Sequence, residues 1–215
     1  DADNNVAIGY QSMLEHTTGA YNTCYGYQTM YSTNAGSNSL ASQRNTFTGY
    51  QAGSGTWGNT AASDENVGIG YLALNGALDN ADNNTVVGAS AGRTITTGDS
   101  NTIVGNASEP SAAGASNQIV IGPNVTGHGD HIAVIGNDSC TAWHPDSNAN
   151  VDLGSTSYRF ANLYVADMQL SNENTDGNEV DGTTGNWSIQ EGEDDLYLLN
   201  RKSGKKYKFK LEEVT

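Results

Sequence analysis

A short apolar run that ends on glycine recurs eight times between residues 6 and 136, and this repeat constrains the fold more than any other feature. Successive repeat glycines lie 17, 23, 21, 18, 17, 17 and 14 residues apart. These intervals are too short for a pair of helices and too long for a lone hairpin. They fit one rung, that is, one turn of a β-solenoid. The repeat glycines are Gly9, Gly26, Gly49, Gly70, Gly88, Gly105, Gly122 and Gly136.

The residues directly before each glycine have the composition of a buried strand. The last residue before glycine is mostly β-branched or aromatic, as in Ile8, Tyr25 and Val87, and such residues suit a pleated surface. The residue two positions before glycine is also apolar or small, as in Cys24 and Val86. Apolar residues at consecutive positions predict short parallel strands that are buried on both faces.

An asparagine stands four positions before glycine in the first six copies, and Gln118 and Ile132 take this position in the last two. Stacked rungs would align these amides in a ladder, in which each side chain bonds to the rungs above and below. Alternatively, each asparagine is a turn residue at the start of its strand. The sequence leaves both interpretations open. The six residues are Asn5, Asn22, Asn45, Asn66, Asn84 and Asn101.

A tyrosine follows the repeat glycine in the first four copies only, and smaller residues replace it in the later ones. We therefore expect the early rungs to share an aromatic stack. Aromatic rings are also a common surface for sugar rings, so these residues are candidates for glycan stacking. The four tyrosines are Tyr10, Tyr27, Tyr50 and Tyr71.

The composition favours a turn-rich repeat protein. Charged residues make up 15% of the 215 residues, against about 25% in ordinary domains. The net charge is -15, and six of the nine Lys and Arg lie within residues 201–210. The repeats therefore have no basic stripe, and we expect no nucleic-acid partner.

The sequence shows no membrane-spanning or targeting segment. A membrane span needs about 18 consecutive apolar residues, and no apolar run is close to that length. No signal peptide is present. We expect no membrane insertion, and a first residue other than Met suggests a processed chain or a piece of a longer one.

The sequence divides into four parts. Residues 1–137 are the solenoid repeats, residues 138–170 a transition segment, residues 171–185 a polar acidic linker, and residues 186–215 a C-terminal β module. This module has three expected strands, at 187–190, 196–200 and 206–211, joined by an acidic turn and a basic turn. About thirty residues are too few for a stable core of their own. We therefore expect the module to trimerise or to dock on another structure.

Several motifs resemble those of known fibres. The copies NVAIGYQSM and NTCYGYQTM resemble repeats of bacteriophage and other viral tail fibre proteins, and they are similar to the head repeats of trimeric autotransporter adhesins. DLGSTSYRFANLY, residues 152–164, resembles a segment that in phage fibres lies ahead of a C-terminal chaperone or tip. The end of the chain, NWSIQEGEDDLYLLNRKSGKKYKFKL, resembles the end modules of fibre-like proteins in marine and cyanobacterial phages.

The resemblance implies an all-β protein, in which a parallel β-solenoid (a trimeric β-helix or β-roll) precedes a small C-terminal β-meander. It implies a stiff homotrimer, a structural and adhesive protein of a virion that attaches to the host surface. The expected partners are two further copies, other virion or baseplate proteins, and a host surface glycan or receptor. Two alternatives are the head of a bacterial trimeric autotransporter adhesin, at the cell surface, and a glycan-cleaving tailspike. The chain has no recognisable virion-anchoring domain and no self-cleaving chaperone domain, so no autoproteolysis is expected.

Motifs for catalysis or metal binding are weak. His128 and His131 are the best metal candidates, but they lie three residues apart beside two glycines, whereas fibre metal motifs space histidines two apart on one strand face. We expect a solvated loop there and no metal.

The acidic residues around Asp79 and Asp82 do not match a calcium loop. The acidic turn at residues 191–195 has no cleft in which a raised pKa would support glycoside cleavage. We expect no enzyme and no cofactor, and we expect this turn to pair with the basic turn of a neighbouring chain.

Overall fold

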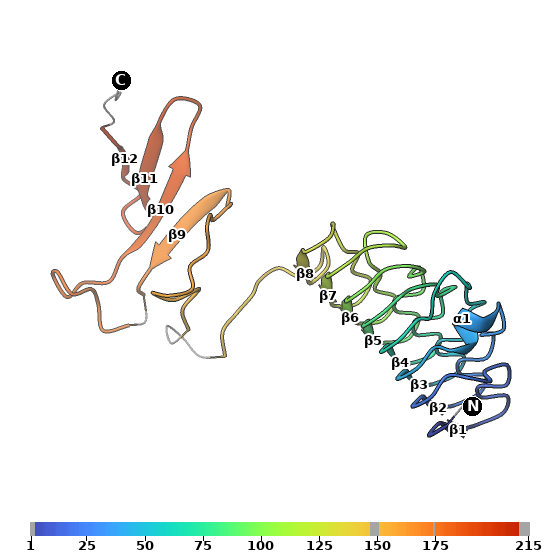
Figure 1. The fold of residues 1–215 in the computed structure, drawn as a ribbon. Helices are drawn as coiled ribbons and strands as arrows, with labels where there is room; N and C mark the ends of the chain where they lie inside the picture. Colours follow the sequence, from blue (N-terminus) through green and yellow to red (C-terminus); the bar gives the residue numbers. More distant parts are fainter. Residues whose placement is uncertain (1–2, 147–150, 174, 211–215) are drawn as a thin grey trace. The chain divides into compact units, whose positions relative to one another are not determined.

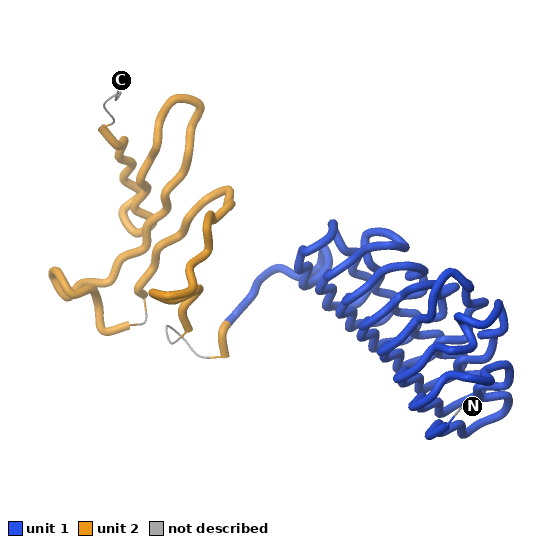
Figure 2. Tube along the Cα trace, in the orientation of Figure 1, with its two compact units in different colours: residues 1–144 blue, residues 145–215 orange. Residues whose placement is uncertain are grey.

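The computed structural model describes residues 3–146, 151–173 and 175–210, and these are almost entirely strands and loops (Figure 1). The chain forms two compact units, residues 1–144 and residues 145–215 (Figure 2). Unit 1 contains an eight-stranded parallel sheet and unit 2 a four-stranded antiparallel sheet. The predicted fold class, a parallel solenoid followed by a small separate β module, is confirmed. Within the described residues, no helix has the length and hydrophobicity that crossing a membrane requires.

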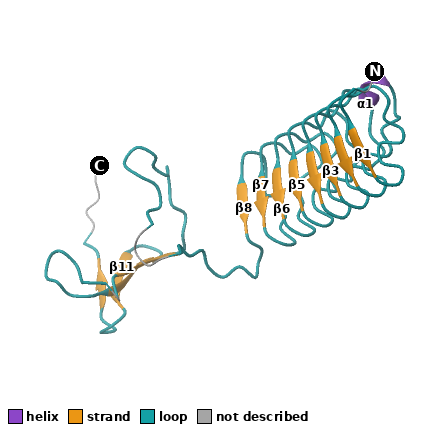
Figure 3. Cartoon of the chain, turned by 90° about the horizontal axis from the view of Figure 1, so that it is seen from below, coloured by secondary structure: helices purple, strands orange, loops and turns teal. Residues whose placement is uncertain are grey.

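Each strand of the solenoid is a triplet that ends directly before a repeat glycine. Neighbouring strands pair residue for residue in chain order, as Val86 does with Ile103, and Figure 3 shows them side by side along one flank of the coil. One short helix, α1 (Ser37–Leu40), lies in the connection between the second and third strands. The strands are β1 (Val6–Ile8), β2 (Thr23–Tyr25), β3 (Thr46–Thr48), β4 (Val67–Ile69), β5 (Thr85–Val87), β6 (Thr102–Val104), β7 (Ile119–Ile121) and β8 (Ala133–Ile135).

Two features require glycine at the repeat position: the backbone conformation of the residue and the close approach of the next rung. Gly88 has a φ of +144°, a region that L side chains rarely adopt, and a Cβ atom on it would collide with the carbonyl oxygen of Gly105 in the next rung. The same relationship links every repeat glycine from Gly9 to Gly105 with the one that follows it. Only glycine lets the chain turn here while the rungs stack at the strand spacing of about 4.8 Å.

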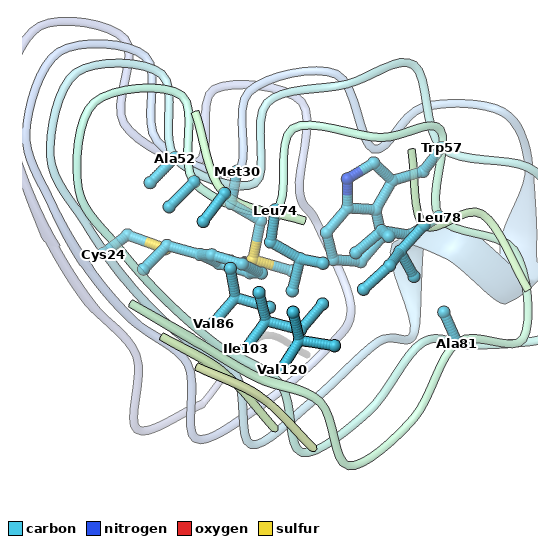
Figure 4. Packing of buried hydrophobic residues seen from close by; sticks show 14 of the residues in the cluster. Cys24, Met30, Ala52, Trp57, Leu74, Leu78, Ala81, Val86, Ile103 and Val120 are labelled. Carbon is cyan, nitrogen blue, oxygen red and sulfur yellow. Dashed lines mark hydrogen bonds between the residues drawn. The ribbon is translucent and has the colours of Figure 1, made fainter. Parts of the chain in front are cut away.

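The core is a column of side chains inside the coil, built from the middle residues of β2, β3, β5, β6 and β7 together with loop residues such as Met30 and Leu74 (Figure 4). Val86, Ile103 and Val120 are fully buried in successive rungs. In β3 the middle residue is Phe47, whose ring meets Trp57 edge-on at a centroid distance of 6.0 Å. The next triplet has Gly68 in this position because a Cβ atom there would overlap the Phe47 ring.

The prediction that these strands are buried on both faces is wrong. The first and third residues of each triplet point away from the coil, and Ile8, Ile69 and Val104 are 53%, 40% and 38% exposed. A coil has its interior on one side of the sheet only, so within one chain the opposite face has no covering layer. The apolar residues at consecutive positions therefore mark one inner column and two outward-facing columns whose residues are half-buried or exposed.

Unit 2 contains an antiparallel meander in the order β12-β11-β10-β9. Its strands are β9 (Asp167–Ser171), β10 (Asn186–Glu191), β11 (Leu196–Asn200) and β12 (Lys206–Lys208). The sequence predicted strands at the positions of β10, β11 and β12, and the structure adds β9, which pairs with β10. The last strand was predicted to extend to Leu211, but β12 ends at Lys208, and Leu211 itself lies outside the described residues.

Candidate functional site

The asparagine column forms a continuous hydrogen-bonded ladder inside unit 1. Asn66 and Asn84 are fully buried. The backbone N–H and the Nδ2 of Asn84 both donate to Oδ1 of Asn66, each at 3.0 Å. Nδ2 of Asn84 also donates to the carbonyl of Gly98 at 2.7 Å, which ties the start of the strand to the loop that leads to the next rung. The same pattern runs from Asn22 to Asn101. Of the two interpretations left open by the sequence, the geometry is that of the ladder.

Two residues mark the ends of this ladder. Asn5, at the first rung, accepts the backbone N–H of Asn22 at 2.7 Å and donates to the carbonyl of Gly19 at 2.7 Å. At the other end, Gln118 donates its backbone N–H to Asn101 at 3.1 Å, and its longer side chain turns away to the hydroxyl of Ser111 at 2.6 Å. The side chains of the ladder use their polar atoms within the fold, so this column has a structural role.

His16 lies beside the first rungs of the ladder and is nearly fully buried. Its Nε2 lies 3.2 Å from the amide nitrogen Nδ2 of Asn22, a contact in which the neutral imidazole can accept a hydrogen bond. Its Nδ1 has no protein partner. Burial lowers the pKa of His16 from its ordinary value of 6.5, and nearby backbone groups of Gly19 and Ser42 partly oppose this effect. This histidine is a buried titratable group of the early rungs, and its protonation would disturb their packing.

The four tyrosines that follow the repeat glycines stack on one another along the outside of unit 1. Their ring centroids are 5.4, 5.0 and 5.4 Å apart, and the interplanar angles are 18°, 3° and 16°. A glutamine ladder runs beside them, in which Gln28 donates to Gln11 and Gln51 donates to Gln28, each at 2.7 Å. The neighbouring rings cover both faces of Tyr27 and Tyr50. Solvent therefore reaches only the edges of these two inner rings.

Tyr71 is at the end of this stack and differs from the inner rings. It is exposed, one of its faces lies against Tyr50, and the next rung has Ala89 at the corresponding position. Within the described residues no ring stacks on its other face. Tyr10 has the same property at the opposite end. Among the four glycan candidates, the two terminal rings therefore offer a ring face, which is what stacking against a sugar requires.

A ladder of carboxylates lies two positions before the asparagines in three successive rungs. Asp82 accepts the backbone N–H of Asp64 at 2.6 Å, and Asp99 accepts that of Asp82 at 2.8 Å. Partial burial raises the pKa of Asp82, and the charges of Asp64 and Asp99 raise it further. Arg44 closes one end through ion pairs to Asp64 at 3.2 Å and to Glu65 at 2.7 Å. These carboxylates bind backbone groups of the preceding rung.

The candidate metal ligands do not converge. Asp79 accepts backbone N–H groups of Thr60 and Ala61 at 2.6 and 3.2 Å, away from the carboxylate ladder. His131 lies with its Nδ1 2.9 Å from Nδ2 of Asn117, whereas His128 lines an open hollow of about 360 Å³ at the last rungs. Across the part of the chain that the structure describes, no group of three or more His, Cys, Asp or Glu side chains is arranged to hold a metal ion.

The acidic turn of unit 2 forms a contact within its own chain. Asp195 pairs with Lys208 of β12 at 2.6 Å, and both side chains are at the surface. The hydrogen bond and charge of Asp195 raise the pKa of Lys208. Sequence reasoning assigned this turn to a neighbouring chain, and it missed Lys208 because the pairing depends on β11 and β12 lying side by side.

One side of the unit 1 sheet faces away from the coil, and we define this outer sheet face as the first and third residues of the eight triplets. It comprises Val6, Thr23, Thr46, Val67, Thr85, Thr102, Ile119 and Ala133 in one column, and Ile8, Tyr25, Thr48, Ile69, Val87, Val104, Ile121 and Ile135 in the other. Neither column contains a charged residue, although the chain as a whole carries a net charge of -15. Such a surface is typical of an interface.

Comparison with protein-family models gives no match, and comparison with curated proteins and with solved structures gives no significant match either.

Proposed function

We propose that this protein is a structural and adhesive fibre protein of a virion, a homotrimer that attaches to the host cell surface. The proposal is supported by the resemblance of its repeats and C-terminal motifs to those of viral tail fibres. One structural observation carries it furthest, namely the regular, uncharged and exposed outer sheet face along the whole solenoid.

The outer sheet face suits assembly from identical copies. Eight strands at a spacing of about 4.8 Å make a surface on the order of 34 Å long, to which every rung contributes two uncharged residues. Packing copies with their strands parallel places β-branched residues such as Ile69 and Val104 against their counterparts and removes them from water. A two-fold pairing would cover this face as well, and the resemblance to trimeric fibres favours a three-fold axis.

A charge-substitution pair tests which surface assembles the protein. Ile69→Lys combined with Val104→Lys places two like charges from every copy in the proposed interface, and we expect the variant to be monomeric by light scattering coupled to size exclusion. Thr17→Lys combined with Thr97→Lys is the matched control, since both threonines are exposed in loops of unit 1, and it should leave the assembly intact. An assembly that survives the Ile69 and Val104 substitutions would show that another surface holds the copies together.

Host attachment is assigned to a ring face of the tyrosine stack, and we take a surface glycan as the target. Tyr71→Ala removes the free ring face beside Ala89, whereas Tyr50→Ala removes an inner ring and leaves Tyr71 in place. A stacking contact of about 1 kcal/mol corresponds to roughly five-fold in affinity. We expect such a loss for Tyr71→Ala and a smaller one for Tyr50→Ala, measured against a panel of purified bacterial surface polysaccharides. Equal losses, or no binding by the wild-type protein to any member, would remove the tyrosines from the proposed site.

A further inference from the structure

One face of the sheet in unit 2 is apolar and uncovered. Strand pairing places Trp187 opposite Leu170, and Ile189 opposite both Met168 and Leu198. Directly opposite residues project from the same side of a sheet. Tyr207 pairs with Leu198 on the next strand, and its ring lies 5.8 Å from that of Trp187, which places both rings on this side. We call this surface the apolar sheet face: Met168, Leu170, Trp187, Ile189, Leu198 and Tyr207.

The opposite face of the same sheet is more polar and makes its own hydrogen bonds, although strand pairing also places Tyr197 and Leu199 on it. Gln190 donates to Asp167 at 2.8 Å, and Arg201 donates to the hydroxyl of Ser188 at 2.8 Å. The two faces therefore differ in polarity, and the apolar sheet face is the one without a second layer.

Unit 2 has no hydrophobic core of its own in the residues that the structure describes. Ser188 is the only buried residue among them. A sheet that is apolar on one side becomes stable when that side packs against another layer of structure, and a four-stranded sheet exposed on both sides lacks this stabilisation. The missing layer has to come from outside the sheet.

The segment of residues 151–165, just ahead of β9, has the apolar side chains that such a layer needs. Tyr158, Phe160 and Tyr164 are 84%, 65% and 91% exposed. The hydrogen bonds recorded within it are local, from the N–H of Ser155 to the carbonyl of Tyr158 at 2.9 Å and from Arg159 to the carbonyl of Thr156 at 2.8 Å. The segment is thus held in shape by its own turn while its aromatic rings lie in solvent.

We propose that residues 151–165 of one copy cover the apolar sheet face of a neighbouring copy, so that unit 2 is completed by exchange between chains. In its own chain the segment ends two residues before the start of β9 and leaves the face uncovered. In a closed ring each copy both gives and receives a segment, so every face and every segment is covered. Three aromatic side chains bury about 150–250 Å² each. Their combined buried area approaches the value for a stable interface, which buries about 800 Å² on each partner.

This inference rests on the proposed homotrimer, and it adds that unit 2 of each copy is incomplete without its neighbour. It also gives the segment that resembles a fibre motif a physical role. Its aromatic residues would act as the second layer of a shared module, which locks together chains already aligned by the outer sheet face of unit 1.

A photocrosslinking experiment on the full chain tests the exchange. p-Benzoylphenylalanine in place of Tyr164 puts a reactive ring in the segment without adding charge. We expect irradiation to give covalent dimers on a denaturing gel, with the crosslink mapped by mass spectrometry to peptides within residues 167–209. The matched control carries the same amino acid in place of Val180, which is 95% exposed in the loop between β9 and β10, and it should give no such dimers.

Three results would overturn the exchange. They are crosslinks within one chain, crosslinks to unit 1, and the absence of crosslinks to residues 167–209. The mass of the protein separates this failure from that of the proposed function. A trimer without interchain crosslinks from position 164 removes the exchange and keeps the homotrimer, whereas a monomer removes both.

Discussion

Oδ1 of Asn66 accepts two hydrogen bonds from Asn84 of the next rung, from the backbone N–H and from Nδ2, each at 3.0 Å. Asn66 in turn donates its Nδ2 to the carbonyl of Ala81 at 2.7 Å. One buried amide thus fixes the start of the following strand and the loop that leads to it. The ladder couples neighbouring rungs through side chains in addition to the pairing of their three-residue strands.

Asn66→Ala should destabilise unit 1 strongly. It leaves the backbone N–H of Asn84 and the carbonyl of Ala81 buried without partners, and each unsatisfied group costs about 1–3 kcal/mol. We expect the free energy of unfolding, from urea titration, to fall by about 3 kcal/mol. Asn106→Ala is the control, because Asn106 is exposed and donates a single bond, to Ala89 at 3.1 Å. Similar small losses for both variants would contradict a structural role of the ladder.

Gly88→Ala should be among the most damaging substitutions of the repeat. The added Cβ would strain a backbone with a φ of +144° and collide with the carbonyl oxygen of Gly105, so we expect a loss of at least about 2 kcal/mol. Thermal unfolding monitored by circular dichroism measures it. Gly114→Ala provides the comparison, since its nearest neighbour is the flexible side chain of Thr97 at 3.0 Å. Equal melting temperatures for the two variants would mean that the glycine column can relax.

The sequence predicted the solenoid because residues that contact their equivalents in the next rung recur at the same position of every repeat. The glycine column, the asparagine column and the tyrosine stack are all contacts between equivalent residues, so a spacing is enough to find them. Burial is different. Ile69 and Gly68 are adjacent and both suit a strand, yet Ile69 lies outside the coil and Gly68 inside it, a difference that depends on which way the chain curls.

The unit 2 sheet was only partly predictable for a related reason. The alternation of Tyr207 and Phe209 with lysines marks the last strand directly. In contrast, β9 alternates polar and apolar residues over only five positions with a single charge, and its strand state depends on the ladder that it forms with β10. The pairing of Asp195 with Lys208 likewise follows from strand order and has no signal in the spacing of the two residues.

Asp82→Asn should stabilise the protein near neutral pH. Partial burial, together with the neighbouring charges of Asp64 and Asp99, raises the pKa of Asp82 in the folded state above its ordinary value of 3.8. The charged form is thus disfavoured by folding, and the stability of the wild-type protein rises as the pH falls through the raised pKa. The amide keeps an acceptor for the N–H of Asp64, so we expect a gain of up to about 1 kcal/mol at neutral pH.

This gain should disappear at about pH 3, where Asp82 is protonated in both the folded and the unfolded protein. Urea titrations of the two proteins across this pH range measure it. Asp176→Asn, at an exposed position in unit 2, should show no such difference. A loss of stability for Asp82→Asn at neutral pH would mean that its carboxylate has a favourable partner.

Acid should loosen the first rungs through His16. Burial lowers the pKa of His16 in the folded state, so its neutral form is favoured by folding. The stability is complete above the ordinary pKa of 6.5 and falls as the pH decreases from there through the lowered pKa. We expect hydrogen exchange of the amides around Asn22 to accelerate between about pH 7 and pH 5 after correction for intrinsic rates, while those around Asn101 stay protected.

His16→Gln isolates this effect. Glutamine offers Asn22 an amide oxygen as acceptor and does not titrate, so the acid-dependent part of the exchange around Asn22 should vanish. If the variant retains the same acid response as the wild-type protein, another group causes it.

The central claim is that identical chains assemble along the outer sheet face into a trimer, and sedimentation velocity of the full chain at micromolar concentration tests it most directly. We predict a single species with three times the 22.5 kDa mass of one chain and a frictional ratio above that of a compact protein. A species with the mass of one chain at that concentration would contradict the account, because it would leave the uncharged columns from Val6 to Ile135 exposed to water without a partner.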